Sequence, residues 1–191
     1  GKVYWSNWSG LSDVSQFIQV QRGLGASALG ISSVGGTMNM VTKSTEAQKG
    51  GSAYFGIGND GFRKYSVSFS TGLMDNGWAI TFMGSLNTGD GYVKGTNYEG
   101  WTYFGNISKV INDHHKLSLT AFGAPQWHNQ RSTMHYIEDY KNSPDGGRFN
   151  NGYGYINGEA VGSGYGYNYY HKPQVSLNHY WTIDDKSTLT T

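Results

Sequence analysis

Alternation of polar and apolar residues is the feature of this sequence that most limits its fold. It runs through successive segments of the chain, at 52–58, 64–71, 78–87, 101–111, 116–126 and 173–183. In the second of them, Tyr65, Val67 and Phe69 alternate with serines. A period of two residues predicts a β-strand with one polar and one apolar face, and no segment shows a sustained helical period. We therefore expect an all-β protein.

Short and long connections alternate between these runs. Turns rich in Asn, Asp and Gly occupy 73–77, 112–115 and 184–187, while the other connections are 59–63, 88–100 and the much longer 127–172. Transmembrane β-barrels have short turns on one side, longer loops on the other, and strands of about 9–11 residues. A soluble β-sandwich is the alternative, since it also alternates strands and turns. A structureless segment of about 45 residues is, however, uncommon in a compact domain.

The composition also favours a membrane-spanning sheet. Charged residues make up 14% of the 191 residues, compared with about 25% in an average soluble domain. Aromatic residues gather near the ends of the predicted strands, as in the girdles of membrane barrels: Trp78, Trp101, Tyr103, Trp127, Tyr169, Tyr170 and Trp181. The net charge of +1 gives no reason to expect a nucleic-acid partner. The lack of cysteine excludes disulfides and thiolate metal sites.

A glycine-rich segment precedes the alternating runs. Residues 20–43 begin with a short apolar run that ends at Arg22 and Gly23, and they finish with a second run that follows Gly35 and Gly36. Two adjacent glycines before an alternating run predict a sharp bend into a strand. A phosphate-binding loop would need a Gly-Lys-Ser/Thr ending and a following helix, and neither is indicated here.

This segment resembles the end of the plug domain of TonB-dependent outer-membrane receptors, just before the chain enters the barrel. The matching positions are Val20, Arg22, Gly23, Ser27, Gly30, Gly35, Gly36, Asn39, Thr42 and Lys43. Leu24 stands where the family often has proline. The resemblance implies that 1–46 is the C-terminal part of a plug, and that 47–191 supplies about six strands and the start of a seventh of a plugged antiparallel transmembrane β-barrel. It also implies a structural role for the plug-motif residues, with Arg22 and Lys43 paired to acids on the inner wall.

The resemblance further implies a function in transport. A receptor of this kind lies in the outer membrane of a Gram-negative cell and imports a scarce nutrient such as a siderophore, cobalamin, an oligosaccharide or a peptide. It is coupled to TonB through an N-terminal box, which we expect to lie outside this chain. Outer-membrane lipid and a surface lipoprotein are further expected partners, and no cofactor is expected. Two other hypotheses are a surface adhesin or carbohydrate-binding β-protein, and a receptor-like barrel acting as a scaffold in an envelope complex.

The long segment at about 127–172, expected to be extracellular, is the predicted ligand-contact region because it is rich in Tyr, Gly and Asn. Tyr and Trp offer large rigid contact areas, and Gly and Asn an adaptable backbone. The candidate substrate-binding residues are Trp127, His128, Arg131, His135, Tyr153, Tyr155, Tyr165 and Tyr167. The alternative for each tyrosine is packing of the loop against its neighbours. The histidines lack metal-ligand spacing, and no nucleophile elbow or spaced carboxylate pair occurs, so we predict neither a metal site nor an enzyme.

Overall fold

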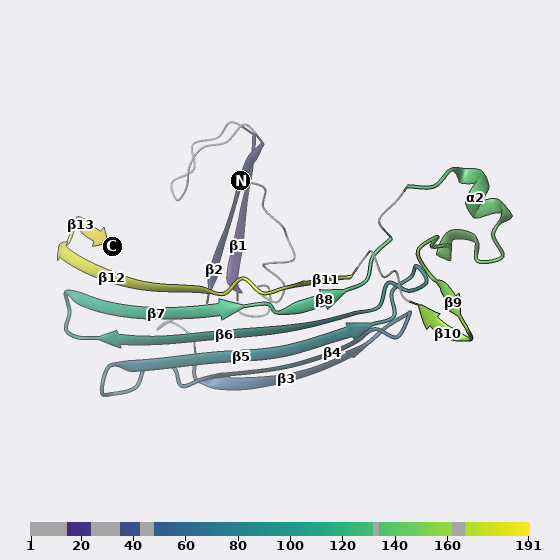
Figure 1. The fold of residues 1–191 in the computed structure, drawn as a ribbon. Helices are drawn as coiled ribbons and strands as arrows, with labels where there is room; N and C mark the ends of the chain where they lie inside the picture. Colours follow the sequence, from purple (N-terminus) through teal and green to yellow (C-terminus); the bar gives the residue numbers. More distant parts are fainter. Residues whose placement is uncertain (1–14, 24–34, 43–47, 132–133, 162–166) are drawn as a thin grey trace.

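The computed structural model describes residues 15–23, 35–42, 48–131, 134–161 and 167–191 (Figure 1). Every strand pair in this part of the chain is antiparallel. Its helical segments are the six-residue α2 (Ile137–Asn142) and the three-residue 3₁₀ turn η2 (Gly146–Arg148). The expected all-β class is therefore confirmed.

A single curved sheet makes up most of the structure. Its strands pair in the order β13-β12-β7-β6-β5-β4-β3, so the described sheet is open, with β3 at one edge and β13 at the other. The strands are β3 (Gly50–Ile57), β4 (Arg63–Ser70), β5 (Trp78–Gly89), β6 (Tyr98–Val110), β7 (His115–Gly123), β12 (Gln174–Asp184) and β13 (Ser187–Thr190). They coincide within a few residues with the alternating runs of the sequence.

Two short strands extend the sheet beyond prolines. β8 (Gln126–His128) follows β7 after Pro125 and pairs with β6, and β11 (Asn168–Tyr170) precedes β12 and Pro173 and pairs with β8. Proline has no N–H to donate to a ladder, which explains the breaks at Pro125 and Pro173. The loop expected at about 127–172 therefore begins with the last two residues of β8, and β11 lies near its other end.

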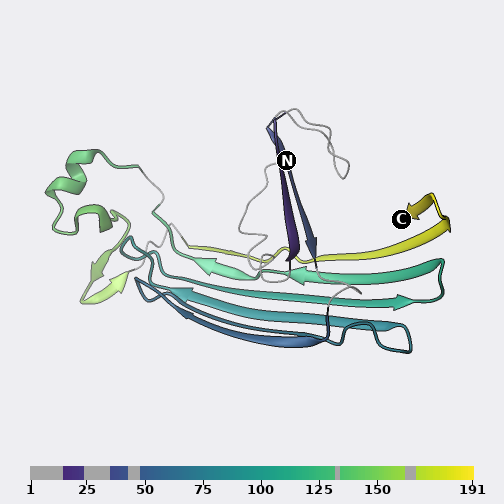
Figure 2. The ribbon, with the colours of Figure 1, turned by 180° about the vertical axis from the view of Figure 1, so that it is seen from behind.

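The connections segregate to the two ends of the sheet (Figures 1 and 2). The end with the short turns 71–77, 111–114 and 185–186 is called the turn end, and the end with 58–62, 90–97 and the long segment is called the loop end. The long segment was expected to lack structure, and this expectation was wrong. It contains α2, η2 and the small hairpin of β9 (Gly154–Ile156) and β10 (Glu159–Val161). Elements of three to six residues are too short to leave a periodic pattern.

A soluble sheet buries an apolar face and exposes a polar one, whereas this sheet buries a largely polar face and exposes an apolar one. The face named the hairpin face is buried, yet most of its buried side chains are small and polar: Ser70, Thr81, Ser85, Thr102, Asn106, Ser108 and Ser118. There the Asn106 amide donates hydrogen bonds of 2.8 Å to Ser118 Oγ and to Thr120 Oγ1. The opposite face, named the apolar face, carries the exposed aliphatic and aromatic side chains of the same strands.

A hairpin of β1 (Ser15–Arg22) and β2 (Gly36–Thr42) stands against the hairpin face, across the direction of the strands (Figures 1 and 2). Met40 of β2 packs on the small buried cluster of Met83 and Phe104. Residues of the glycine-rich motif pair within this hairpin, where Arg22 is the register partner of Gly36 and Gln19 that of Asn39. Gly23 and Gly35 are the next residues beyond the Arg22–Gly36 pair. Lys43 lies outside the described residues.

Candidate functional site

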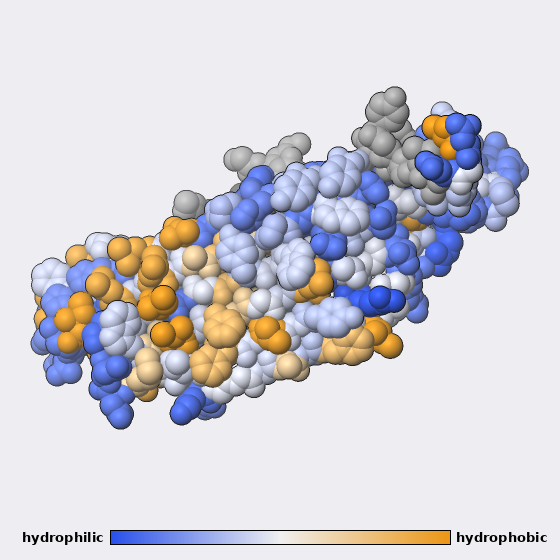
Figure 3. Space-filling view, turned by 60° about the horizontal axis from the view of Figure 1, so that its bottom comes forward, coloured by the Kyte–Doolittle hydropathy of each residue, from blue (hydrophilic) through white to orange (hydrophobic). Residues whose placement is uncertain are grey.

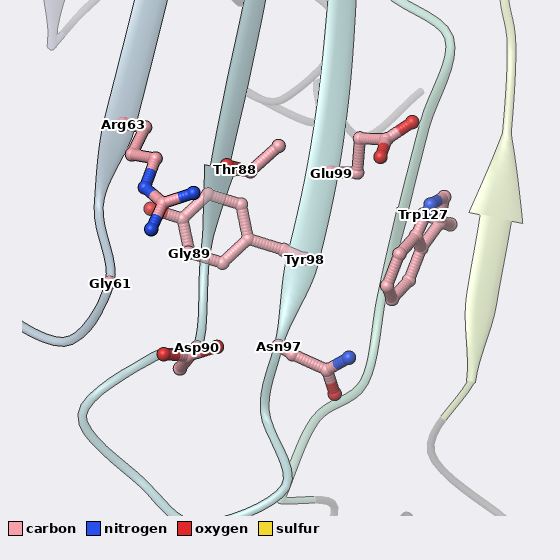
Figure 4. Close-up of a pocket in the computed structure, with 9 residues that line it drawn as sticks. All are labelled: Gly61, Arg63, Thr88, Gly89, Asp90, Asn97, Tyr98, Glu99 and Trp127. Atoms are coloured by element: carbon pink, nitrogen blue, oxygen red, sulfur yellow. The ribbon is translucent and has the colours of Figure 1, made fainter.

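A pocket of about 270 Å³ lies at the loop end of the sheet. One row across four strands supplies much of its lining, because Arg63, Thr88, Glu99 and Trp127 are register partners in β4, β5, β6 and β8. The remaining lining residues are Gly61, Gly89, Asp90, Asn97 and Tyr98. Figure 4 shows Arg63 and Trp127 on opposite sides of the site, with Asp90 and Asn97 below them where the strands end.

The pocket combines both signs of charge with aromatic rings. Arg63 lies on one side, and Asp90 and Glu99 bring carboxylates. Glu99 is already oriented by a hydrogen bond of 2.9 Å from Trp101 Nε1. Guanidinium and carboxylate groups make the strong, directional hydrogen bonds that fix a polar ligand, and an indole such as that of Trp127 offers a flat face for stacking. The arrangement suits reversible binding of a polar solute.

The long segment is fastened over the neighbouring loops by two ion pairs. Lys94 pairs with Asp145, and Arg148 Nη2 lies 2.6 Å from Asp60 Oδ1. Backbone bonds reinforce them: the Lys94 N–H donates to the Arg148 carbonyl at 2.9 Å. The Asn150 amide donates to the Lys94 carbonyl at 2.8 Å. Three loops of the loop end are thereby joined into one assembly beside the pocket.

The contacts of this assembly shift two pKa values. The side-chain hydrogen bond to Asp145 raises the pKa of Lys94 above its usual 10.5, despite some desolvation. The hydrogen bond between Tyr153 and Tyr155, whose hydroxyl oxygens lie 3.5 Å apart, raises the pKa of Tyr153. Tyr153 lies against Gly95, which has a φ of +69° and where a Cβ would come within 2.3 Å of the Tyr153 ring. Glycine is therefore required where the two loops meet.

The predicted site residues fall into three local groups. Trp127 lines the pocket and stacks on Tyr167, with ring centroids 6.1 Å apart, and His128 follows it in β8. Tyr153 and Tyr155 form a second group with edge-to-face rings 5.9 Å apart. Tyr165 lies outside the described residues.

Arg131 and His135 form the third group, which is an aromatic cluster within the long segment. Arg131 donates a 3.1 Å hydrogen bond to the Phe149 carbonyl and lies over the Tyr140 ring at 5.2 Å. The His135 ring contacts Tyr140 and Phe149 edge-on, at 5.8 and 5.1 Å. These contacts hold the segment together, which is the packing alternative considered for this region.

Sequence reasoning missed the pocket residues other than Trp127 and the ion pairs that fasten the loops. Arg63, Asp90 and Glu99 looked like ordinary residues of strand ends and turns. Asp60 and Arg148 are 88 positions apart in the chain, so no local spacing relates them. The one usable signal was the pair of Gly- and Asp-containing loops at 58–61 and 89–91, which meet where the Asp90 N–H donates to the Asp60 carbonyl.

Arg22 is exposed, and the ion pairs found between described residues, Lys94–Asp145 and Arg148–Asp60, do not include it. The expected pairing of Arg22 and Lys43 with acids of the inner wall therefore stays a prediction. Among the described residues, no group of three His, Asp or Glu side chains lies close enough together to hold a metal ion.

Neutralising both fastening carboxylates is expected to loosen the long segment without unfolding the sheet. Exposed ion pairs contribute little to global stability, so the sheet should stay folded while the double variant Asp60→Asn/Asp145→Asn is cut by trypsin within 137–148 a few-fold faster than the parent. The raised Lys94 pKa means that its pair contributes below pH 10.5 and is lost as the pH rises through the raised value. Asp113→Asn, in a turn at the other end of the sheet, is the control. Equal cleavage of all three proteins would contradict the fastening role.

Comparison with known proteins adds no identification. No protein-family model matches the chain, and no curated protein sequence matches it. Within the described residues, no helix is both long enough and apolar enough to cross a membrane.

Proposed function

We propose that this chain is part of a plugged transmembrane β-barrel that acts as a TonB-dependent outer-membrane receptor and imports a scarce nutrient. The observation that carries the proposal is the apolar face of the sheet. Its side chains are hydrophobic and uncovered, as in Val67 (54% exposed), Phe82 (50%) and Val175 (71%). Figure 3 shows orange and pale side chains side by side over this face, with blue side chains at the left-hand, turn end and at the right-hand, loop end.

A bilayer is the environment that makes this arrangement favourable. Each exposed aliphatic side chain in water forgoes about 1.5–3 kcal/mol of burial, and continuous apolar patches on proteins mark contact with a partner or a membrane. Lipid-facing strands alternate apolar outward and polar inward, which is the pattern of β4, β5 and β6. The serine, threonine and asparagine side chains of the hairpin face fit the interior of a barrel.

The aromatic side chains bound this apolar band at both ends. Trp101 and Tyr65 lie on the apolar face toward the loop end, and Trp78 and Trp181 lie on it toward the turn end. Between them runs an aliphatic row in which Ile80, Ile107, Leu119 and Leu177 are register partners. Bands of this form, apolar with aromatic margins, are typical of outer-membrane barrels.

The remaining features support the receptor function within that frame. The hairpin of β1 and β2 stands against the polar face, where a plug would fill the barrel, and its sequence carries the motif that resembles the family. Short turns suit the periplasmic side and long loops the outside. The loops of the loop end would then face the medium and would meet the nutrient first. The pocket would open at the outer rim of the barrel, because its row of Arg63, Thr88 and Glu99 lies on the same face as Tyr65, Leu86 and Trp101.

Uptake by intact cells tests the receptor function. Deleting the segment that precedes this chain in the full-length protein, where the TonB box is expected, should abolish nutrient uptake and leave binding at the cell surface unchanged. The reason is that binding uses the loop end, whereas coupling uses the periplasmic partner. Removing TonB from the cell should give the same result, and uptake that persists in both cases would sink the transporter proposal.

A further inference from the structure

We propose that the turn end of the apolar face binds the phosphate group of an anionic glycerophospholipid. The site, named the turn-end belt, consists of Trp78, Lys109, His115, His179 and Trp181. The inference rests on the membrane location proposed above, and it goes beyond it by assigning a specific lipid site. Its ligand belongs to the membrane leaflet on the turn side and is distinct from the imported nutrient.

Strand register brings the belt together from four strands. Trp78, Lys109, Leu117 and His179 are successive partners across β5, β6, β7 and β12, and they therefore form one row on the apolar face. The next row toward the turns contains His115 beside Trp181. The row on the other side is the aliphatic one of Ile80, Ile107, Leu119 and Leu177. A headgroup at the belt would thus have aliphatic side chains beside its acyl chains.

Lys109 is held in place with donors to spare. Its ammonium donates to the Asn76 carbonyl at 2.5 Å and lies over the Trp78 ring, 5.2 Å from the centroid. An ammonium group has three N–H donors, so this carbonyl does not exhaust it. A lysine anchored over a tryptophan at the edge of an apolar band is positioned to meet a phosphate at the lipid–water boundary.

The two histidines form a hydrogen-bonded pair that also offers a donor. His115 Nδ1 and His179 Nε2 are 3.0 Å apart, and their rings stack at 5.2 Å with an interplanar angle of 16°. Trp181 continues the stack, 5.7 Å from His115. Whichever ring donates in this bond, the accepting neutral imidazole carries its own N–H on its other nitrogen. That N–H can donate to a phosphate oxygen.

The electrostatics of the belt favour an anion. Its ionisable side chains are one lysine and two histidines, whereas the carboxylates nearest in sequence belong to the turns or the strand ends next to them: Asp75, Asp113, Asp184 and Asp185. The matching row at the loop end differs, since it contains a carboxylate, Glu99, as well as Arg63, with Thr88 between them. Lys109 and His179 are two strand spacings apart, about 10 Å, which a flexible lysine side chain and a glycerophosphate group can bridge. The Lys109 cation, in rows that contain no carboxylate, therefore favours an anionic headgroup at the turn end.

Native mass spectrometry of the full-length protein in detergent can test the site. After delipidation, the protein is titrated with phosphatidylglycerol and with phosphatidylcholine of the same acyl chains. We expect retention of phosphatidylglycerol in preference to phosphatidylcholine. Lys109→Gln should weaken phosphatidylglycerol binding about tenfold, because hydrogen bonds to charged groups are worth roughly that factor or more. The double variant His115→Gln/His179→Gln should weaken it as well.

Lys116→Gln is the matched control, since this substitution also removes one lysine charge near the turn end. Lys116 lies on the opposite face of the sheet, over the ring of Tyr180. Equal binding of the two lipids, or an equal loss in Lys116→Gln, would overturn the site. Soluble glycerophosphate should not compete, and if it does, the ligand is a free phosphate and the lipid assignment is wrong. Flotation with liposomes distinguishes failure of the lipid site from failure of the membrane location. Protein that floats without lipid preference refutes the turn-end belt alone. Protein that stays in solution refutes the membrane location and the belt together.

Discussion

Replacing Val175 with lysine is expected to destabilise the folded protein in a bilayer by about 2–4 kcal/mol, the cost of a lysine near the midplane on a lipid-facing position. Val175 lies on the apolar face, in the row that it shares with Ala121 and Gly105, well inside the aromatic margins. The measurement is urea unfolding of the full-length protein in lipid vesicles, followed by tryptophan fluorescence. The amount of folded protein in the outer-membrane fraction should fall in parallel.

The neighbouring residue provides the control. Ser176 is also exposed and belongs to the same strand, but it lies on the hairpin face and pairs with Thr120. Ser176→Lys should therefore change the stability by much less than Val175→Lys. A soluble sheet would respond differently, because lysine at an exposed position usually changes stability by no more than about 0.5 kcal/mol. Two equally mild substitutions would favour the adhesin hypothesis over the membrane one.

The strands of the main sheet could be predicted because their pattern is local. Tyr65, Val67 and Phe69 alternate with serines, and in the structure the valine is exposed while Ser70 is buried. The alternation fixed which residues share a face, but the sequence alone does not state which face meets water. Pairing at the ends was less predictable: Thr88 and Gly89 join the ladder opposite Glu99 and Tyr98 without any apolar alternation.

The site could be predicted only as a region. Tyrosine and glycine content pointed to the long segment, and Trp127 does line the pocket. The other pocket residues come from strand ends that meet through register, and register depends on the whole sheet. The His115–His179 pair shows the same limit, because the two residues are 64 positions apart and become neighbours only when β7 and β12 align. Composition points to a region of the chain, whereas topology decides which side chains meet.

The hairpin of β1 and β2 should be disrupted by replacing Gly36 with alanine. Gly36 has a φ of +109°, which side chains rarely tolerate, and an added Cβ would lie 2.2 Å from the Gln21 carbonyl oxygen and 3.1 Å from Arg22 Cα. Backbone strain of this kind costs about 1–3 kcal/mol, and the steric conflict is with backbone atoms that cannot rotate away. Hydrogen exchange of the β1 and β2 amides should therefore accelerate roughly 5- to 150-fold, as that range of free energy implies.

Gly35 makes this prediction specific, because it is also a glycine, lies one position away and has a different environment. No heavy atom lies within 4 Å of a Cβ built on Gly35, and its φ is outside the region that side chains avoid. Gly35→Ala should not accelerate the exchange of the hairpin and should slow it by up to about fivefold, since alanine at a compatible position stabilises a protein by about 0.4–1 kcal/mol. The amides of β5 and β6 should be unaffected in both variants, because they belong to the ladder of the main sheet, whereas β1 and β2 form a separate two-stranded sheet. If Gly35→Ala disturbs the hairpin as much as Gly36→Ala does, the paired glycines act through chain flexibility, and the close approach at Gly36 is not what the hairpin requires.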